Sequence, residues 1–169
     1  MNDPNRVVIF TTQSNMSHLN NSSIWIADGT FKVVPREFGQ LYVIHAKILG
    51  KHFPLLFILM KTRKEENYSK MLSILTDKGI IFPKVLIVDF EFQSYVAFKK
   101  ATKQTSIYFC MFHFGQCIWR RIQKEGLSQS YCDDTNFRMF VKCFLSLAFV
   151  PLQSVKKEFS KLVNEANRY

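Results

Sequence analysis

No hydrophobic run of the sequence is long enough to cross a membrane, because none approaches the ~20 apolar residues that a spanning helix requires. The first residues, Met1–Arg6, are polar and do not resemble a signal peptide. The sequence also lacks the glycine-rich loop that binds nucleotide phosphates and the nucleophile elbow of many hydrolases. We therefore expect neither a membrane partner nor a small-molecule cofactor.

Negative charge is scarce, since 13 Asp and Glu residues are set against 23 Lys and Arg residues, for a formal net charge of +10. A positive potential of this size attracts polyanions, of which nucleic acid is the commonest. The hydrophobic content of 47% and aromatic content of 15% exclude a disordered tail. A chain of 169 residues can bury one substantial core, so we expect a single domain that contacts nucleic acid.

Cysteine is also scarce, and its spacing does not supply two pairs of metal ligands. Of the four cysteines, Cys110, Cys117, Cys132 and Cys143, only the first has ligand spacing, in Cys110-x-x-His113. Cys117 is a candidate third ligand, but the set remains incomplete. Because no secretory signal is present, we expect reduced thiols, and neither a disulfide framework nor a structural zinc site.

Apolar periodicity predicts a mixed α/β fold. Short connections of hairpin length predict an antiparallel meander of three strands, at Ile24–Asp28, Leu41–Ile48 and Phe53–Met60. Two further strands of the parallel type, joined by right-handed crossovers, are expected at Pro83–Asp89 and Ser106–Phe112. The crossover helices are expected at Phe92–Lys100 and after a capping box at Thr62–Glu65, with an apolar face of Tyr68, Met71, Leu72 and Leu75.

The sequence predicts that the chain has three parts. Residues 1–21 are expected to be a tail of a preceding region, because the polar run Ser14–Ser23 favours a loop. Residues 22–131 form the predicted core, in which Cys110–Gln116 is expected to be a short buried strand that turns into a helix and runs into the basic amphipathic segment Cys117–Lys124. Residues 132–169 are expected to be an all-helical insertion, with one helix starting at Pro151. That helix is still periodic at Tyr169, so we expect a truncated domain.

Two isolated aspartates, Asp28 and Asp89, close otherwise apolar strands. Asp is disfavoured in strands, and burying an unpaired carboxylate is costly. Each has a local explanation, because Asp28-Gly29 is turn-like and Asp89 is placed to cap the next helix. As a pair they favour a site for Mg²⁺, which binds one or two carboxylates with water and phosphate oxygens. Both carboxylates lie at one site if the first and fourth predicted strands are neighbours.

Five sequence blocks resemble the signature blocks of Mutator-like element (MULE) transposases. They are ADGTFKVVP (Ala27–Pro35), YVIHA (Tyr42–Ala46), IVDFE (Ile87–Glu91), CMFHFGQCIWRRIQ (Cys110–Gln123) and FRMFVKCFLSLAFVP (Phe137–Pro151). The resemblance implies a ribonuclease H-like fold, a DDE triad holding two Mg²⁺ or Mn²⁺ ions, and cleavage and transfer of DNA strands in transposition. It further implies transposon ends and target DNA as partners, a homo-oligomer on DNA and a nuclear location.

When the family's motifs are matched to this sequence, the resemblance implies that Asp28 and Asp89 are catalytic residues and metal ligands. Cys110 and His113 match the family's C-x-x-H block near the active site, for which we expect a role in positioning DNA. The family's third carboxylate is a Glu that follows a helical insertion, and Asp133–Tyr169 resembles that insertion with nothing after it. The third carboxylate is therefore absent from this chain, and its activity as an enzyme stays open.

The remaining acidic and basic residues support smaller predictions. The late glutamates Glu158 and Glu165 lie among lysines and are expected on a solvated helix face. For the helix after the C-x-x-H block, the apolar side is expected to pack, leaving three cations to solvent or to phosphate. The expected DNA-binding residues are Arg120, Arg121 and Lys124, together with Lys99 and Lys100.

Three functions remain as hypotheses. The first is a transposase catalytic domain descended from a Mutator-like element. The second is a domesticated, catalytically inactive derivative that binds DNA and regulates transcription in the nucleus. The third, a nuclease of the same fold that acts on RNA–DNA hybrids, is disfavoured because the helical insertion is typical of a transposase.

Overall fold

The structure is a computed structural model that describes residues 3–31 and 33–166. It divides into two compact units, Met1–Cys110 and Met111–Tyr169. The first unit contains a mixed sheet with helices, and the second is helical among the residues described. Within the described part of the chain, no helix combines the length and the apolar character needed to cross a membrane. The predicted boundaries at residues 21/22 and 131/132 stay a prediction.

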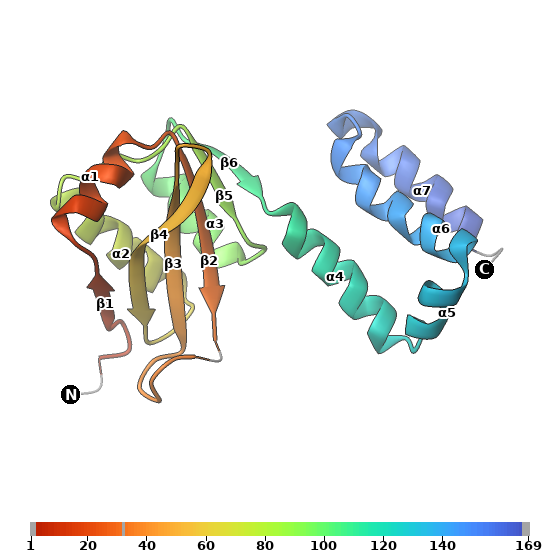
Figure 1. Cartoon of the computed structure of the whole chain (residues 1–169), viewed down its shortest axis with the longest axis horizontal. Coiled ribbons are helices and arrows are strands. Elements are labelled where there is room, and N and C mark those ends of the chain that lie inside the picture. Colours follow the sequence, from red (N-terminus) through yellow and green to blue (C-terminus); the bar gives the residue numbers. More distant parts are fainter. Residues whose placement is uncertain (1–2, 32, 167–169) are drawn as a thin grey trace. The chain divides into compact units, whose positions relative to one another are not determined.

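The first unit is built on one six-stranded sheet with the order β1-β4-β3-β2-β5-β6 (Figure 1). The strands alternate apolar and polar positions or are apolar throughout, as expected for half-buried and fully buried strands. They are β1 (Val7–Phe10), β2 (Ile24–Thr30), β3 (Gln40–Ile48), β4 (Lys51–Met60), β5 (Val85–Val88) and β6 (Ser106–Phe109).

The strand pairing confirms the predicted meander and the predicted parallel strands. β2 pairs with β3 and β3 with β4 in antiparallel fashion. β2 then pairs with β5, and β5 with β6, in parallel. The predicted set of five strands is incomplete, because β1 adds a sixth at the edge by antiparallel pairing with β4.

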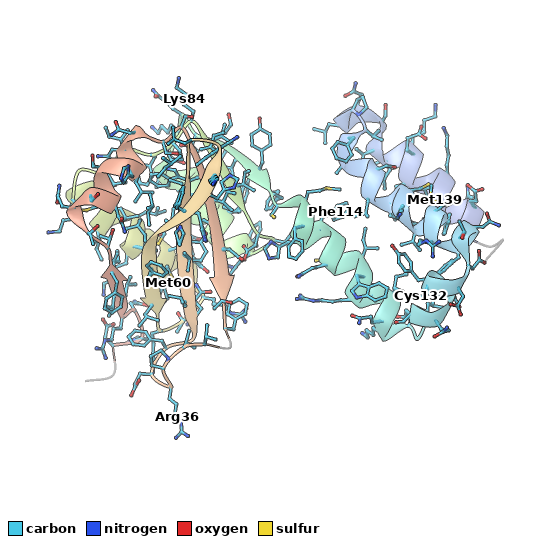
Figure 2. All side chains as sticks on the ribbon, viewed as in Figure 1. Arg36, Met60, Lys84, Phe114, Cys132 and Met139 are labelled. Carbon is cyan, nitrogen blue, oxygen red and sulfur yellow. The ribbon has the colours of Figure 1, made fainter. Side chains whose placement is uncertain are left out.

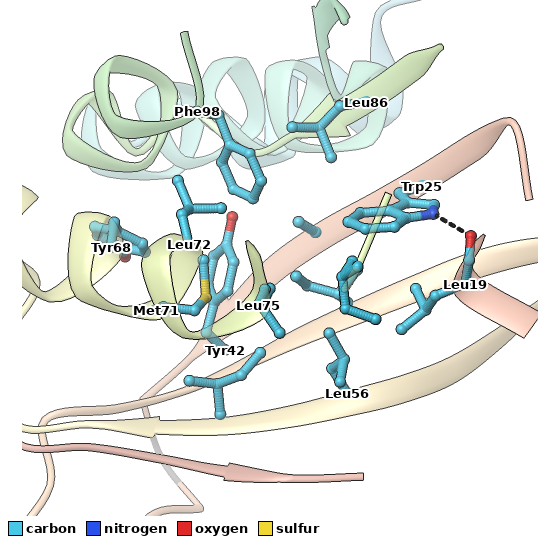
Figure 3. Close-up of a cluster of buried hydrophobic side chains, with 14 of the residues drawn as sticks. Leu19, Trp25, Tyr42, Leu56, Tyr68, Met71, Leu72, Leu75, Leu86 and Phe98 are labelled. Carbon is cyan, nitrogen blue, oxygen red and sulfur yellow. Dashed lines mark hydrogen bonds between the residues drawn. The ribbon is translucent and has the colours of Figure 1, made fainter. Parts of the chain in front are cut away.

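The hydrophobic core lies between the sheet and helices α1 (Gln13–Asn21), α2 (Glu65–Asp77) and α3 (Phe92–Ala101). Figure 3 shows Leu72 and Phe98 from the helices packed toward Tyr42 and Leu86 of the strands. The predicted apolar face of α2 is confirmed, since its four residues are buried. The indole Nε1 of Trp25 donates to the Leu19 carbonyl at 3.2 Å, which fastens α1 to β2.

The loop predicted at Ser14–Ser23 is wrong, because α1 occupies most of that run. The Thr12 hydroxyl caps the helix by accepting the N–H of Asn15 at 3.1 Å. Only Leu19 of this helix is buried, so its apolar periodicity was too weak to be seen in the sequence. Residues 3–21 therefore contribute a strand and a helix to the sheet unit.

The capping box predicted at Thr62–Glu65 is also wrong. Helix α2 begins at Glu65, and its N-cap is Lys64, which makes no side-chain capping bond. The Thr62 hydroxyl instead donates to the side-chain oxygen of Asn67 at 3.1 Å. The Thr62 hydroxyl, which was expected to cap the helix backbone, is therefore hydrogen-bonded to the side chain of the buried Asn67.

The strand predicted at Ser106–Phe112 is shorter than expected and not buried. β6 ends at Phe109, lies at the edge of the sheet and has mostly exposed residues. Helix α4 already begins at Met111. Cys110 therefore lies at the junction, and His113 lies in the first turn of the helix.

The second unit begins with α4 (Met111–Lys124), followed by α5 (Ser128–Asp133), α6 (Thr135–Ser146) and α7 (Val155–Glu165). Short 3₁₀ turns at Leu147–Phe149 and Leu152–Ser154 join the last two helices, so the final helix starts after its predicted first turn at Pro151. Phe144 of α6 meets Phe159 of α7 edge to face. Figure 2 labels Phe114, Cys132 and Met139 within this unit.

Replacing Leu72 by Ala should destabilise the sheet unit, because this side chain is 2% exposed at the centre of the α2 face. We expect a loss of about 2–5 kcal/mol in the free energy of unfolding. Urea unfolding followed by Trp25 fluorescence, in a Trp119→Phe background, would measure this unit alone, since the chain has two tryptophans. The control Val33→Ala, at a 70% exposed position, should change stability by less than about 0.5 kcal/mol. Equal losses in both variants would contradict the core assignment.

Candidate active site at the carboxyl ends of β2 and β5

Asp28 lies inside β2, where it pairs with Val43 of β3. Gly29, the next residue, pairs with Tyr42, so the Asp28-Gly29 turn considered from the sequence is wrong. Side chains alternate along a strand, and Ala27 faces the buried side of the sheet. Asp28 therefore faces the opposite side, and its Oδ1 atom is shielded from solvent.

Asp89 follows the last residue of β5 and is 9% exposed. Its Oδ1 accepts the backbone N–H of Glu91 at 3.0 Å. Glu91 is the N-cap residue of α3 and makes no capping bond of its own. Asp89 thus stabilises the turn that leads into the helix, which agrees in part with the capping role considered from the sequence.

The two aspartates lie at the same end of the sheet, because β2 and β5 are parallel neighbours. The register pairs Ala27 with Val88, so Asp28 and Asp89 occupy the next position on each strand. A site shared by the two aspartates required β2 and β5 to be neighbours, and the observed pairing satisfies that condition. Figure 2 marks Lys84, just before β5, at the opposite end of the sheet from Arg36 in the β2–β3 connection.

The donor chemistry of this pair fits a divalent cation, because carboxylate oxygens are the hard donors that Mg²⁺ and Mn²⁺ prefer. The fit is limited to two carboxylates. Among residues 3–31 and 33–166, no three His, Cys, Asp or Glu side chains are grouped so that they could hold a metal ion. Cys110 and His113 therefore also belong to no group of three possible metal ligands in that part of the chain.

A third carboxylate, Glu91, lies close to Gly29 on the helix-covered side of the sheet. A Cβ atom placed on Gly29 would be 3.5 Å from Glu91 Oε2 and 3.2 Å from Gln40 Oε1. Gln40 is fully buried, and its Nε2 donates to the Tyr68 hydroxyl at 2.5 Å. This group is not predicted from the sequence, although IVDFE contains Glu91, because no local pattern brings Gln40 and Tyr68 beside it.

The surroundings of Glu91 raise its pKa above the ordinary value of 4.5. Burial of the carboxyl is the largest cause, and the negative charge of Asp89 adds to it. A hydrogen bond from Tyr68 and the positive charge of Arg63 act in the opposite direction. Arg63 also stacks over the Phe31 ring, with its guanidinium carbon 4.7 Å from the ring centroid.

His45 lies on the same face of β3 as Val43, two residues along the strand. Burial is the main cause that lowers the pKa of His45, while a hydrogen bond to the Ile26 backbone and the charge of Asp28 act to raise it. A lowered pKa keeps the imidazole neutral near pH 7. His45 therefore adds no positive charge beside Asp28.

The C-x-x-H residues follow the outer parallel strand. The N–H of Cys110 donates to the Val88 carbonyl at 2.7 Å, which continues the β5–β6 pairing by one residue. All four cysteines are free thiols, as expected from the sequence. His113 is half-buried in α4, where its ring meets Phe112 edge to face.

The predicted DNA-binding cations are exposed. Arg120, Arg121 and Lys124 lie on α4, and Ile122 on the same helix is buried. Arg121 pairs with Glu125 at 3.0 Å, with 71% of the arginine side chain exposed, so the pair is screened and weak. On α3, Lys100 pairs with Glu65 of α2 at 2.6 Å.

The late glutamates lie on the last helix, α7. Glu158 pairs with Lys161 at 2.9 Å on that helix, as predicted for a solvated helix face.

A family model described as MULE transposase domain matches residues 24–116, more than half of the chain. The matched range begins at the first residue of β2 and ends within α4, so it includes both aspartates and the C-x-x-H block. No curated protein matches the sequence.

Replacing Glu91 by Gln should stabilise the metal-free protein at neutral and alkaline pH. Because the folded-state pKa of Glu91 is raised, ionising it costs folding free energy above that pKa, and the cost disappears as pH falls toward 4.5. The Gln variant lacks this cost, so its advantage should be largest above the raised pKa and absent near pH 4. Thermal unfolding in a chelator between pH 4 and pH 8 would measure it. The exposed control Glu37→Gln should show no such pH dependence, and an equal pH dependence would contradict the assignment.

Proposed function

Because the chain belongs to the MULE transposase domain family, we propose that it is a DDE-type transposase catalytic domain with a ribonuclease H-like fold. In this role it cleaves and transfers DNA strands with Mg²⁺ or Mn²⁺ during transposition. The mixed six-stranded sheet with its parallel β2–β5–β6 half is compatible with that fold.

One observation carries the proposal. The parallel pairing of β2 with β5 sets Asp28 and Asp89 at equivalent positions on neighbouring strands. Two neighbouring carboxylates, one of them 9% exposed, supply the hard oxygen donors that a divalent cation binds.

In the proposed mechanism Asp28 and Asp89 would hold the metal through their carboxylate oxygens. The ion, when bound, supplies Lewis-acid stabilisation of the phosphoryl oxygens and lowers the pKa of water. The hydrogen bond from the Glu91 N–H to Asp89 Oδ1 fixes one oxygen of that carboxylate.

DNA is the proposed partner, as transposon ends and target. The net charge of +10 provides long-range attraction for the phosphate backbone. Arg120, Arg121 and Lys124 on α4, with Lys99 and Lys100 on α3, are the proposed phosphate contacts. Cys110 and His113 have a proposed role in positioning DNA, and a homo-oligomer on DNA and a nuclear location belong to the same proposal.

A second function is favoured by one specific observation. Within the described ranges no group of three acidic or other metal-ligating side chains is assembled. A domesticated derivative that binds DNA and regulates transcription without catalysis needs the basic surface but no complete metal site. The two functions differ in metal binding and strand cleavage, and agree in DNA binding.

Replacing Asp28 by Asn should weaken Mn²⁺ binding by about tenfold or more, because the variant keeps the shape but removes one anionic ligand. Isothermal titration of the full chain with Mn²⁺ would measure this. Asp89→Asn should have a similar effect, and both should abolish metal-dependent nicking of supercoiled DNA.

The matched control for the Asp28 variant is Asp77→Asn, at an exposed position in the last turn of α2. It should leave Mn²⁺ affinity unchanged. Equal affinity in wild type, Asp28→Asn and Asp77→Asn would contradict the catalytic proposal. DNA binding without Mn²⁺ binding or nicking would establish the inactive derivative.

Removing the two α4 arginines, in Arg120→Ala/Arg121→Ala, should weaken DNA binding with little dependence on sequence. Each phosphate contact that is lost should reduce the slope of log affinity against log salt by about 0.9. Fluorescence anisotropy with duplex DNA at several salt concentrations would measure the slope.

Lys156→Ala/Lys157→Ala is the control, because it removes the same charge from exposed positions on α7. If both double variants lower the affinity and the slope equally, only net charge matters. The proposed α4 contacts would then be wrong.

A further inference from the structure

Gly29 is closely packed, although its backbone conformation does not require a glycine. Among the described glycines, those with positive φ are Gly50, Gly79 and Gly126, so Gly29 has an ordinary backbone conformation. A Cβ on it would nevertheless lie 3.2 Å from Gln40 Oε1, which is tighter than ordinary van der Waals contact. Space, and not backbone geometry, therefore explains a glycine at this position of β2.

The group that fills this space is polar and anchored. Glu91 Oε2 is shielded from solvent and lies 3.5 Å from the Cβ position of Gly29. The Glu91 carboxylate is hydrogen-bonded to Tyr68 of α2, whose hydroxyl also accepts a hydrogen bond from the Nε2 of fully buried Gln40 at 2.5 Å. The Glu91 side chain thus reaches from the start of α3 to a fixed point beneath β2.

The backbone of the same residue contacts the acidic pair. The Glu91 N–H donates to Asp89 Oδ1 at 3.0 Å, across a turn of two residues. A side chain that is fixed beneath β2 also fixes the position of this N–H. The direction of the Asp89 carboxylate then depends on where the Glu91 side chain is held.

We propose that Glu91 is a positioning residue: its side chain, seated beneath Gly29 and hydrogen-bonded to Tyr68, holds the β5–α3 turn so that Asp89 stays directed toward the site that it shares with Asp28. The link to metal binding rests on the proposed function, whereas the link between the Glu91 side chain and the Asp89 turn does not. Partners that orient a metal ligand typically contribute about 10–100-fold to metal affinity.

The proposal depends on the shape and reach of the side chain, and so predicts which substitutions preserve it. Glu91→Gln keeps the length and the planar end group. Glu91→Asp keeps the charge but is one methylene shorter, and Glu91→Ala removes the anchor. We therefore expect Gln to behave as wild type and Asp to behave as Ala, which is the reverse of what a direct metal ligand would show.

The first experiment uses the metal-free chain. Amide hydrogen exchange at residue 91, followed by NMR, should be at least tenfold faster in Glu91→Ala and Glu91→Asp than in wild type, and nearly unchanged in Glu91→Gln. Exchange in the middle of β3 serves as the internal control for global stability. Unchanged exchange at residue 91 in all three variants would overturn the proposal, whatever the metal data show.

The second experiment is titration with Mn²⁺ alone. Glu91→Ala and Glu91→Asp should weaken binding by about tenfold or more, and Glu91→Gln by less than about threefold. If Gln loses as much affinity as Ala, Glu91 acts through its charge and the positioning role is wrong. If wild type binds no Mn²⁺, the metal arm of the proposed function fails, and the exchange experiment still decides the positioning role.

A double-mutant cycle tests the contact with Gly29. Gly29→Ala should by itself accelerate exchange at residue 91, because the new methyl group lies 3.2 Å from Gln40 Oε1 and displaces Gln40, which shares Tyr68 with Glu91. In the Glu91→Ala background the same change should have little further effect, since the side chain that it would disturb is already absent. Gly115→Ala is the control, because its Cβ would meet only Leu145 at an ordinary distance of 3.7 Å. Additive effects of Gly29→Ala and Glu91→Ala would contradict the proposed contact.

Discussion

The parallel pairing of β2 with β5 is the constraint on which the candidate active site depends. These strands are separated along the chain by β3, β4 and α2, yet they are neighbours in the sheet. Their register pairs Ala27 with Val88 and so places Asp28 and Asp89 at equivalent positions. A shift of one residue would turn one carboxylate to the other face of the sheet. The apolar residues around the pair, among them Leu86 and Val88, fix this register through burial.

A polar network lies beneath this site inside an otherwise apolar core. The hydroxyls of Tyr42 and Ser94 lie 2.6 Å apart, and Gln40 donates to Tyr68. Burial raises the pKa of both tyrosines, so they stay neutral and act as hydrogen-bonding groups. Buried polar groups cost free energy unless they are paired, so such a network favours one arrangement of α2, α3 and β3. The same arrangement seats Glu91 under Gly29.

The second unit contributes a different kind of chemistry. Its α4 helix separates an apolar side, with Ile122 buried, from a basic side with Arg120, Arg121 and Lys124. The family match extends into this helix and so includes the C-x-x-H block with the two carboxylates. The proposed metal ligands on the sheet and the proposed phosphate contacts on an exposed helix suit different tasks, because metal geometry must be exact to fractions of an ångström whereas phosphate attraction acts over about 10 Å.

The sequence by itself determined the elements whose side-chain period is strong. It predicted β2 to β5, α2 and α3, the meander and strands of the parallel type, because apolar periodicity is a local signal. It singled out the two aspartates but left the pairing of β2 with β5 as a condition, which the structure supplies. It did not assign β1, which is apolar but only four residues long, or α1, in which only Leu19 is buried. It also misplaced the cap of α2, where Asn67 competes for the Thr62 hydroxyl. Only the tertiary structure decided the partners of Glu91. Gln40, Tyr68 and Gly29 lie on three different elements, and contacts between distant elements come from the packing of the whole core, which no local pattern encodes.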